Sequence, residues 1–316
     1  MAYYIIVFVL LMVAELLYFK VAEKCNIIDN PNERSSHTTV TLRGGGIIFY
    51  FGVLAFFLAS GGRHPWMMAA LTLVSFVSFW DDVKSLSQGV RLFFQFVAMA
   101  LMFVQWAMYC QPWLLVIVLL VACVGVINAF NFMDGINGIT GGYSLVILLF
   151  MEYVNRTRIV FVEESFIGTM LCAVLVFCFF NFRNKAKCFA GDVGSVSIAF
   201  VLLYLLGRLV IKSHDLSWVV LMAVYGVDSV LTIVHRLILR ENIAQPHRKH
   251  LYQLMANELK IPHVRVSAVY MIIQVIVSVG YLTIPVNGYL YLVVAVALLS
   301  IVYVCFMKKY YHLHQG

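Results

Sequence analysis

The sequence has little charge. Asp, Glu, Lys and Arg make up 12% of its 316 residues, whereas hydrophobic residues make up 63%. A soluble domain typically carries about 25% charged residues. The mean hydropathy is +0.92, and a chain of this length cannot bury so much apolar surface in a soluble core. We therefore exclude a soluble fold and expect an integral membrane protein.

Other absences narrow the class further. Apolar and polar residues do not alternate within the apolar stretches, and this excludes a transmembrane β-barrel. The first stretch, 3–19, has no basic segment before it and no small-residue cleavage site, so we expect a membrane span rather than a signal peptide. The seven cysteines show no metal-binding spacing. The net charge of +7 lies between the stretches and forms no nucleic-acid-binding patch.

The apolar stretches have the length of helices that cross a hydrocarbon core of about 30 Å. We predict an all-α polytopic bundle of about eleven transmembrane helices in a single domain, 1–316, with no internal repeat and no separate soluble domain. The predicted spans are roughly 2–20, 46–60, 66–80, 91–110, 113–130, 139–154, 165–181, 196–211, 217–239, 264–284 and 289–307.

The basic residues predict the orientation. Most of the 22 Lys and Arg residues fall in one set of loops, and basic residues concentrate in cytoplasmic loops. We therefore expect the N-terminus outside and the C-terminus in the cytoplasm. All the polar clusters described below then lie on the cytoplasmic side, which indicates chemistry at an inner membrane face.

Two adjacent carboxylates end the third stretch, in Asp81-Asp82-Val83-Lys84. At a membrane edge the two negative charges repel each other, and removing them from water is unfavourable. Such a pair suits a hard divalent cation, which prefers carboxylate oxygens, and Lys84 can neutralise the pair or hold a phosphate. The alternative is a solvated helix end with an ion pair.

The second cluster, 128–138, contains Asn128, Asn131, Asp134 and Asn137. The first three are spaced by three and share one face of a helix. Carboxamides and a carboxylate on one face can hydrogen-bond a sugar or nucleoside, or orient a phosphate. The alternative is a polar helix end that glycine terminates.

The third cluster is Gly191-Asp192-Val193-Gly194-Ser195. Asp192, flanked by glycine, can present its carboxylate to a cation. Ser195 lies near the cap of the following helix, whose N-terminus suits an anion. A plain turn with an N-cap is the alternative.

Basic residues supply the remaining candidates. Arg240, His247 and His250 follow the ninth stretch and suit phosphate contact or proton donation, or they anchor the chain to lipid head groups. The glycine-rich loop 34–46, with Arg43, is either a phosphate or nucleotide loop or a flexible lead into a span. Asp228 lies inside the ninth stretch and is either functional or part of a structural pair.

In this order and topology the clusters resemble the polyprenyl-phosphate N-acetylhexosamine-1-phosphate transferases, a membrane superfamily that includes the peptidoglycan translocase and the initiators of O-antigen and teichoic-acid synthesis. The matching motifs are Asp81-Asp82-x-Lys84, Asn128-x-x-Asn131-x-x-Asp134-Gly135-x-Asn137-Gly138, Gly191-Asp192-x-Gly194-Ser195 and His247-x-x-His250, and the segment 41–46 resembles the first cytoplasmic motif of the family.

The resemblance implies that a polyprenyl (undecaprenyl) phosphate attacks a UDP-activated N-acetylated sugar at the inner leaflet of a bacterial inner membrane, and that UMP leaves. It implies Mg²⁺, with Mn²⁺ as the alternative, held by Asp192 with Asp81 and Asp82, which also activate or orient the lipid phosphate. It assigns the nucleotide and sugar side to Asn128, Asn131, Asp134 and Asn137, uracil stacking to Phe189, and phosphate contact to His247 and His250. Because three phosphates that meet in one place carry several negative charges, we expect a divalent cation, Lys84, Arg43, Arg240 and these histidines to hold them together, beside the helix that begins near Ser195.

One departure bears on the substrate. The peptidoglycan translocase has three consecutive histidines in its last loop, whereas this chain has His247-Arg248-Lys249-His250. We therefore expect a simple UDP-sugar, such as UDP-GlcNAc or a deoxy relative, and O-antigen or capsule initiation. Two mechanisms stay open: direct attack by the lipid phosphate, and a covalent route with Asp192 or Asp82 as nucleophile. A homodimer also stays open. The competing functions are a polytopic transporter or flippase and a non-catalytic scaffold.

Overall fold

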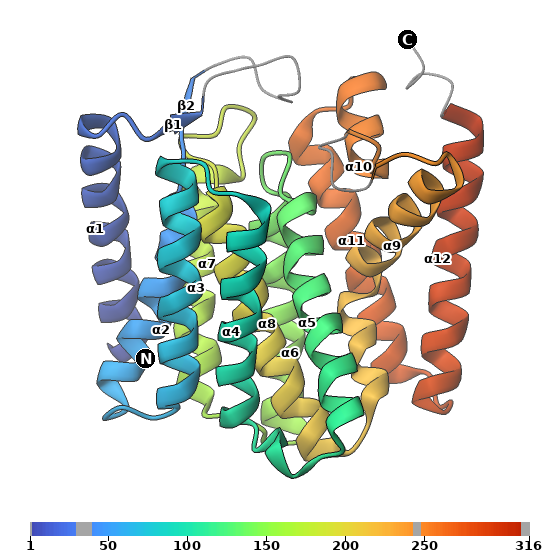
Figure 1. Ribbon diagram of the computed structural model, residues 1–316, viewed down its shortest axis with the longest axis horizontal. Coiled ribbons are helices and arrows are strands. Elements are labelled where there is room, and N and C mark those ends of the chain that lie inside the picture. Colours follow the sequence, from blue (N-terminus) through green and yellow to red (C-terminus); the bar gives the residue numbers. More distant parts are fainter. Residues whose placement is uncertain (1, 30–39, 243–247, 311–316) are drawn as a thin grey trace.

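The computed structural model describes residues 2–29, 40–242 and 248–310. They form a bundle of long, roughly aligned helices (Figure 1). The long helices are α1 (Ala2–Lys24), α3 (Pro65–Val83), α4 (Gln88–Gln105), α5 (Trp113–Met133), α6 (Ile139–Thr157), α7 (Glu164–Asn181), α8 (Gly191–Ser213), α9 (Ala223–Ile238), α11 (His263–Thr283) and α12 (Gly288–Tyr310).

Shorter elements complete the described chain. They are the strands β1 (Ile28–Asp29) and β2 (Thr41–Leu42), the helix α2 (Ile48–Ala59), the single turn α10 (Leu251–Gln253), and the irregular turns η1 (Gly45–Ile47), η2 (Met108–Cys110), η3 (Leu216–Met222) and η4 (Leu254–Glu258).

The all-α membrane class is confirmed. Within the described ranges, nine helical segments are long and apolar enough to cross a membrane, and Gly45–Ala59 is a shorter apolar helix. Every predicted span falls on a helical segment, including 139–154 within α6. The number of crossings and the orientation stay predictions.

Helix α8 occupies the centre of the bundle. In its most apolar window 78% of the residues are buried, whereas only 17% are buried in α5 and in α12. The exposed side chains of the peripheral helices are large and apolar, as expected where lipid is the solvent. The buried core therefore surrounds α8, and Asp192 lies in the first turn of this helix.

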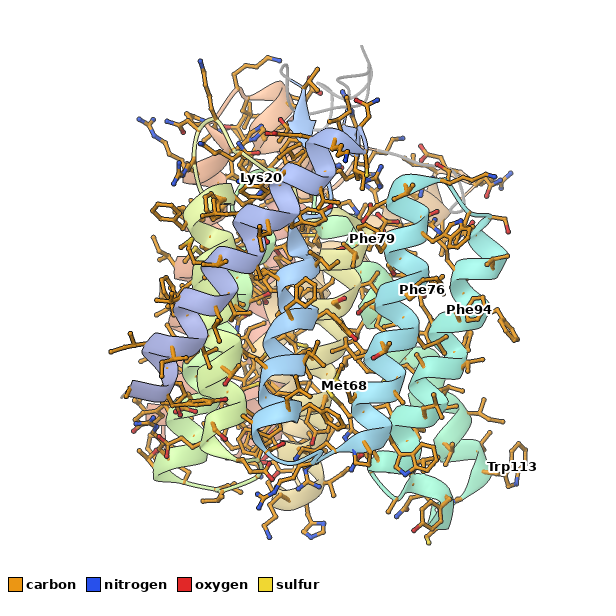
Figure 2. The ribbon with its side chains drawn as sticks, turned by 90° about the vertical axis from the view of Figure 1, so that its left-hand side faces the viewer. Lys20, Met68, Phe76, Phe79, Phe94 and Trp113 are labelled. Atoms are coloured by element: carbon orange, nitrogen blue, oxygen red, sulfur yellow. The ribbon has the colours of Figure 1, made fainter. Side chains whose placement is uncertain are left out.

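One end of the bundle carries all the polar motifs in the described residues. Helices α3, α5 and α7 end there, and α4, α6, α8 and α11 begin there, beside the antiparallel pair β1–β2. Lys20 lies near this end, whereas Trp113 lies at the other (Figure 2). The predicted gathering of the motifs on one side is thus what the fold produces.

The loop with Arg43 lies directly against the start of α8. The peptide N–H groups of Gly45 and Gly46 donate to the carbonyl oxygens of Phe189 and Ala190. A Cβ atom on Gly46 would lie 2.2 Å from the Cα atom of Gly194, so only glycine permits this approach. The glycine run is therefore a packing surface that brings Arg43 to α8.

Candidate functional site

Asp82 caps the N-terminus of α8. Its Oδ1 accepts from the peptide N–H of Asp192 (2.9 Å) and from Arg43 Nε (2.6 Å), and its Oδ2 accepts from the peptide N–H of Val193 (2.9 Å). The Asp82 side chain is 0% exposed. A carboxylate that satisfies the first N–H groups of a helix and complements its dipole stabilises that end. Asp82 therefore holds Asp192 in place across two helices.

Asp81 faces a different way, because consecutive side chains on a helix point about 100° apart. Asp81 Oδ1 accepts from the peptide N–H of Leu86 (2.5 Å), and Oδ2 accepts from Arg91 Nη1 (3.0 Å). The same Nη1 donates to Asp192 Oδ2 (2.8 Å). Arg91, on α4, thus joins the carboxylates of α3 and α8.

Two arginines converge on Asp192. Besides its contact with Arg91, Asp192 Oδ1 accepts from Arg43 Nη2 (3.4 Å). Partial burial lowers the pKa of the Arg43 guanidinium, but the carboxylates of Asp82 and Asp192 outweigh it and raise that pKa above the ordinary value. The site therefore carries fixed positive charge beside the aspartates.

Asn131 contributes from α5. Its Nδ2 donates to Asp192 Oδ1 (3.1 Å) and to Ser195 Oγ (3.0 Å). Ser195 lies inside α8 and donates to the carbonyl oxygen of Gly191 (3.1 Å), so the capping group is Asp82 and not Ser195. Asn128 turns to α4, where its Nδ2 donates to Gln95 Oε1 (2.7 Å). The predicted face of α5 therefore divides between two neighbours.

Asp134 lies just past the end of α5. Burial raises the pKa of its carboxyl to about 7. Next to it, a Cβ atom on Gly135 would lie 2.2 Å from the hydroxyl oxygen of Tyr252, and that hydroxyl donates to the carbonyl oxygen of Phe132 (2.8 Å). The turn after α5 is therefore packed under α10.

Asn137 and Phe189 belong to the loops around the site. Asn137 Nδ2 donates to the carbonyl oxygens of Arg183 (2.9 Å) and Asn184 (3.2 Å). The peptide N–H of Phe189 donates to the carbonyl oxygen of Leu42 (2.8 Å), which places its half-buried ring beside the loop with Arg43. In these contacts Asn137 orders the 183–184 turn, and its predicted contact with substrate stays a prediction.

His250 is 2% exposed, and its Nδ1 lies 3.2 Å from Asp228 Oδ1. Asp228 also accepts from the hydroxyl of Tyr270 (2.6 Å) and the peptide N–H of Leu251 (3.2 Å). Of the two interpretations of Asp228, these contacts favour the structural pair. His247 lies outside the described residues.

The remaining predicted cations lie at the surface. Lys84 follows α3 and is exposed, and Arg240 follows α9 and is exposed. Neither forms an ion pair with any residue of the described ranges. Both side chains are therefore available to ligands from the aqueous side.

The donor set suits a hard divalent cation only in part. Within residues 2–29, 40–242 and 248–310, no three His, Cys, Asp or Glu side chains form a group that could hold a metal. Asp81 Oδ2 and Asp192 Oδ2 do converge, because both contact Arg91 Nη1. Two carboxylates with substrate phosphates form a usual Mg²⁺ site, so Asp81 and Asp192 fit the ion, whereas both Asp82 oxygens face α8 and Arg43.

Sequence reasoning missed four polar residues. Arg91, Gln95, Asn181 and Gln274 lie in apolar stretches and in no motif. Asn181 accepts from the peptide N–H of Gly138 (2.7 Å) and donates to the carbonyl oxygen of Cys188 (2.8 Å). Their one available signal was a polar side chain within an otherwise apolar run, which predicts a buried partner.

Comparison with known proteins gives consistent matches. Residues 64–210 match the family described as glycosyl transferase family 4. The probable undecaprenyl-phosphate N-acetylglucosaminyl 1-phosphate transferase of Bacillus subtilis is 28% identical over 263 residues, which cover 75% of this chain and 72% of that protein. The undecaprenyl-phosphate alpha-N-acetylglucosaminyl 1-phosphate transferases of Escherichia coli K12 (27%) and Salmonella typhi (29%) match 75% of this chain and 71% of their own.

These matches confirm the resemblance that the motifs predicted: residues 64–210 match glycosyl transferase family 4, and the similar proteins are undecaprenyl-phosphate N-acetylglucosaminyl 1-phosphate transferases, which matches the predicted superfamily.

Proposed function

We propose that the chain transfers an N-acetylated sugar-1-phosphate from a UDP-sugar to a polyprenyl phosphate at the cytoplasmic face of a bacterial inner membrane. An oxygen of the lipid phosphate bonds to the sugar-bearing phosphorus, the bond from that phosphorus to UMP breaks, and a polyprenyl diphosphate sugar remains. The relatives' names favour undecaprenyl phosphate and GlcNAc. The initiation of O-antigen or capsule synthesis belongs to the same proposal.

The observation that carries the proposal is the cluster of Asp81, Asp192, Arg43 and Arg91 at one polar end of a membrane bundle. Arg91 Nε is buried and has no hydrogen-bond partner within the described chain, so a phosphate oxygen would satisfy it. Phosphoryl transfer needs mainly positioning and charge neutralisation, and this cluster supplies both.

The residues divide the work in this proposal. Asp82 holds the start of α8, and Asn131 orients the Asp192 carboxylate. Arg43 and Arg91 bind phosphate oxygens, with Lys84 at the rim. Mg²⁺ bound by Asp81 and Asp192 would neutralise phosphate charge.

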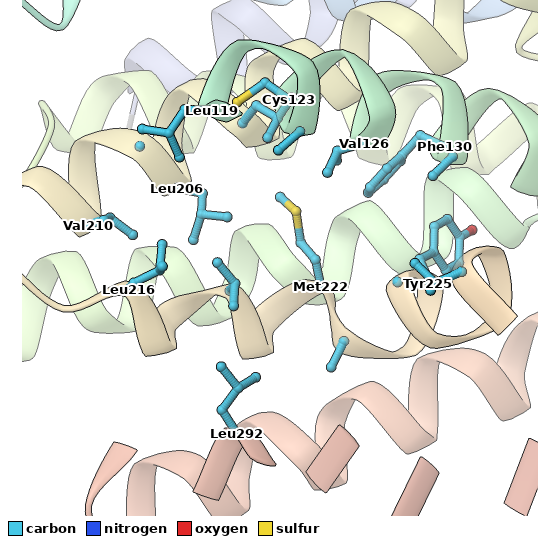
Figure 3. Close-up of a pocket in the computed structure, with 18 of the residues that line it drawn as sticks. Leu119, Cys123, Val126, Phe130, Leu206, Val210, Leu216, Met222, Tyr225 and Leu292 are labelled. Carbon is cyan, nitrogen blue, oxygen red and sulfur yellow. The ribbon is translucent and has the colours of Figure 1, made fainter. Parts of the chain in front are cut away.

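An apolar pocket of about 690 Å³ suits the lipid tail (Figure 3). Its lining comes from α4, η2, α5, α8, η3, α9 and α12 and is almost entirely apolar. Phe130 lines it, and the next residue, Asn131, contacts Asp192. The pocket therefore reaches the helical turn of α5 from which Asn131 contacts Asp192. The transporter alternative is disfavoured because Asp228, inside its span, is occupied by protein partners.

The test is a membrane assay over a panel of UDP-sugars with undecaprenyl phosphate and Mg²⁺, following both UMP and the lipid-linked sugar. We expect UMP release that requires acceptor and metal. Asp215→Asn, an Asp-to-Asn change at the opposite end of the bundle, is the control for the same change at Asp192 and should keep full activity. Absence of release with every sugar would contradict the proposal. Incubating labelled UDP-sugar without lipid, and looking for labelled protein, separates the covalent from the direct route.

A further inference from the structure

The ninth predicted span is not one regular helix. Residues Leu216–Met222 form the 3₁₀ segment η3, and the α-helix α9 starts at Ala223. A change of helix type frees backbone groups, and within a bilayer neighbouring helices must satisfy them. The break therefore needs specific partners.

Gln274 of α11 supplies these partners. Its Nε2 donates to the carbonyl oxygen of Val220 (3.1 Å), and its Oε1 accepts from the peptide N–H of Val224 (3.3 Å). One side chain thus spans the break and bonds to both sides of it. Gln274 is 0% exposed, so water cannot replace it.

Tyr143 of α6 locks the same place. Its hydroxyl donates to Gln274 Oε1 (2.6 Å) and accepts from the peptide N–H of Tyr225 (3.3 Å). The rings of Tyr143 and Tyr225 stack with centroids 3.7 Å apart. Gln274 and Tyr143, together the clamp, therefore hold both sides of the junction between η3 and α9.

The clamp acts on two parts of the proposed site. One helical turn along, Tyr270 of α11 bonds Asp228 of α9, which orients His250. Residues on both sides of the break line the apolar pocket, among them Met222 of η3 and Tyr225 of α9. Neither clamp residue lines the pocket, so the clamp reaches it through the stacked ring of Tyr225 and the direction of α9.

We propose that Gln274, held by Tyr143, is a positioning residue that sets the direction of α9 and thereby the fit of a long-chain polyprenyl phosphate. This inference rests on the proposed function for the identity of the ligand. Gln274 lies outside every motif and outside the segment 64–210 that matches the family, whereas Tyr143 lies within that segment but in no motif. The inference predicts selective loss of affinity for long acceptors, because a short acceptor does not need the pocket wall.

The test measures equilibrium binding of undecaprenyl phosphate and geranyl phosphate to the purified full chain. Gln274→Leu should weaken the affinity for undecaprenyl phosphate about tenfold and leave the affinity for geranyl phosphate unchanged. The reason is that the backbone groups at the break lose their hydrogen bonds, and α9, one wall of the pocket, is displaced. Ser278→Ala removes only an acceptor within α11 (3.0 Å from Gln274 Nε2) and is the matched control. Damage to folding alone would lower the number of binding sites and not the ratio of the two affinities.

Tyr143→Phe keeps the ring stack and removes the hydroxyl, so it provides a second reading if Gln274→Leu does not fold. It should shift the ratio in the same direction by a smaller factor. An unchanged ratio in both variants, or no binding of undecaprenyl phosphate to the wild type, overturns the inference. A wild type that binds undecaprenyl phosphate with the predicted variant effect, yet releases no UMP, leaves the inference standing and contradicts the proposed function instead.

Discussion

Replacing Asp82 separates a residue that positions the site from residues that contact the substrate. The carboxylate satisfies two peptide N–H groups at the start of α8 and Arg43 Nε. Asp82→Ala removes both acceptor oxygens, and with them all three hydrogen bonds, at a place that is closed to water. Asp82→Asn keeps the shape and one acceptor oxygen but removes the charge.

The structure sets the size of the effect. Loss of an N-cap side chain costs about 1 kcal/mol, and an unmet buried donor costs about 1–3 kcal/mol. Asp82→Ala should therefore lower the free energy of unfolding by about 2–4 kcal/mol, and Asp82→Asn by about half as much. Activity should fall in both, because Asp192 moves with the start of α8.

Thermal unfolding in detergent and UMP release, measured on the same preparations, check this prediction. Asp81→Asn is the comparison, since Asp81 caps no long helix and should lose activity with little loss of stability. If Asp82→Ala abolished activity and its unfolding temperature matched that of the wild type, Asp82 would act directly on metal or substrate and our reasoning would be refuted.

Further predictions concern the charges around Asp192. Arg91→Met should lower the rate of UMP release about a hundredfold, and Arg91→Lys less, because the two carboxylates lose their shared cation; equal rates in both variants and the wild type would exclude this role. Burial raises the pKa of Asp134 to about 7, so ionising it costs stability as pH rises from its ordinary range to 7. Asp134→Asn should therefore raise the unfolding temperature more at pH 8 than at pH 5, and an equal shift at both values would show that its charge is not penalised.

The class and the location of the site could be predicted from the sequence. Long apolar runs predict helices, and polar clusters at their ends predict where ligands meet them. Asp81, Asp192, Arg43 and Asn131 therefore come together as expected.

The direction of each side chain could not be predicted in the same way. Asp81 and Asp82 are equivalent in the sequence, but only Asp82 points at the end of α8. The motif also does not reveal that the Asn137 amide donates to the carbonyl oxygens of the turn at 183–184. These outcomes depend on how distant helices cross, and no local pattern contains that information.

The hydrogen bonds between buried polar side chains of different helices also could not be predicted from the sequence. Arg91 and Gln274 have partners on other helices, far away in the chain. The junction between η3 and α9 is formed by Met222 and Ala223. No glycine or proline stands at this junction to indicate a break in the helix. Periodicity therefore predicted one continuous span there.

The most direct test of the account is the rate of Mg²⁺-dependent UMP release by Asp192→Asn. The aspartate lies where Arg43, Arg91 and Asn131 meet, so we predict a loss of more than about a hundredfold, with normal membrane insertion and an unfolding temperature close to that of the wild type. Near-normal turnover of Asp192→Asn would contradict the claim that this carboxylate holds the cation at the centre of the reaction.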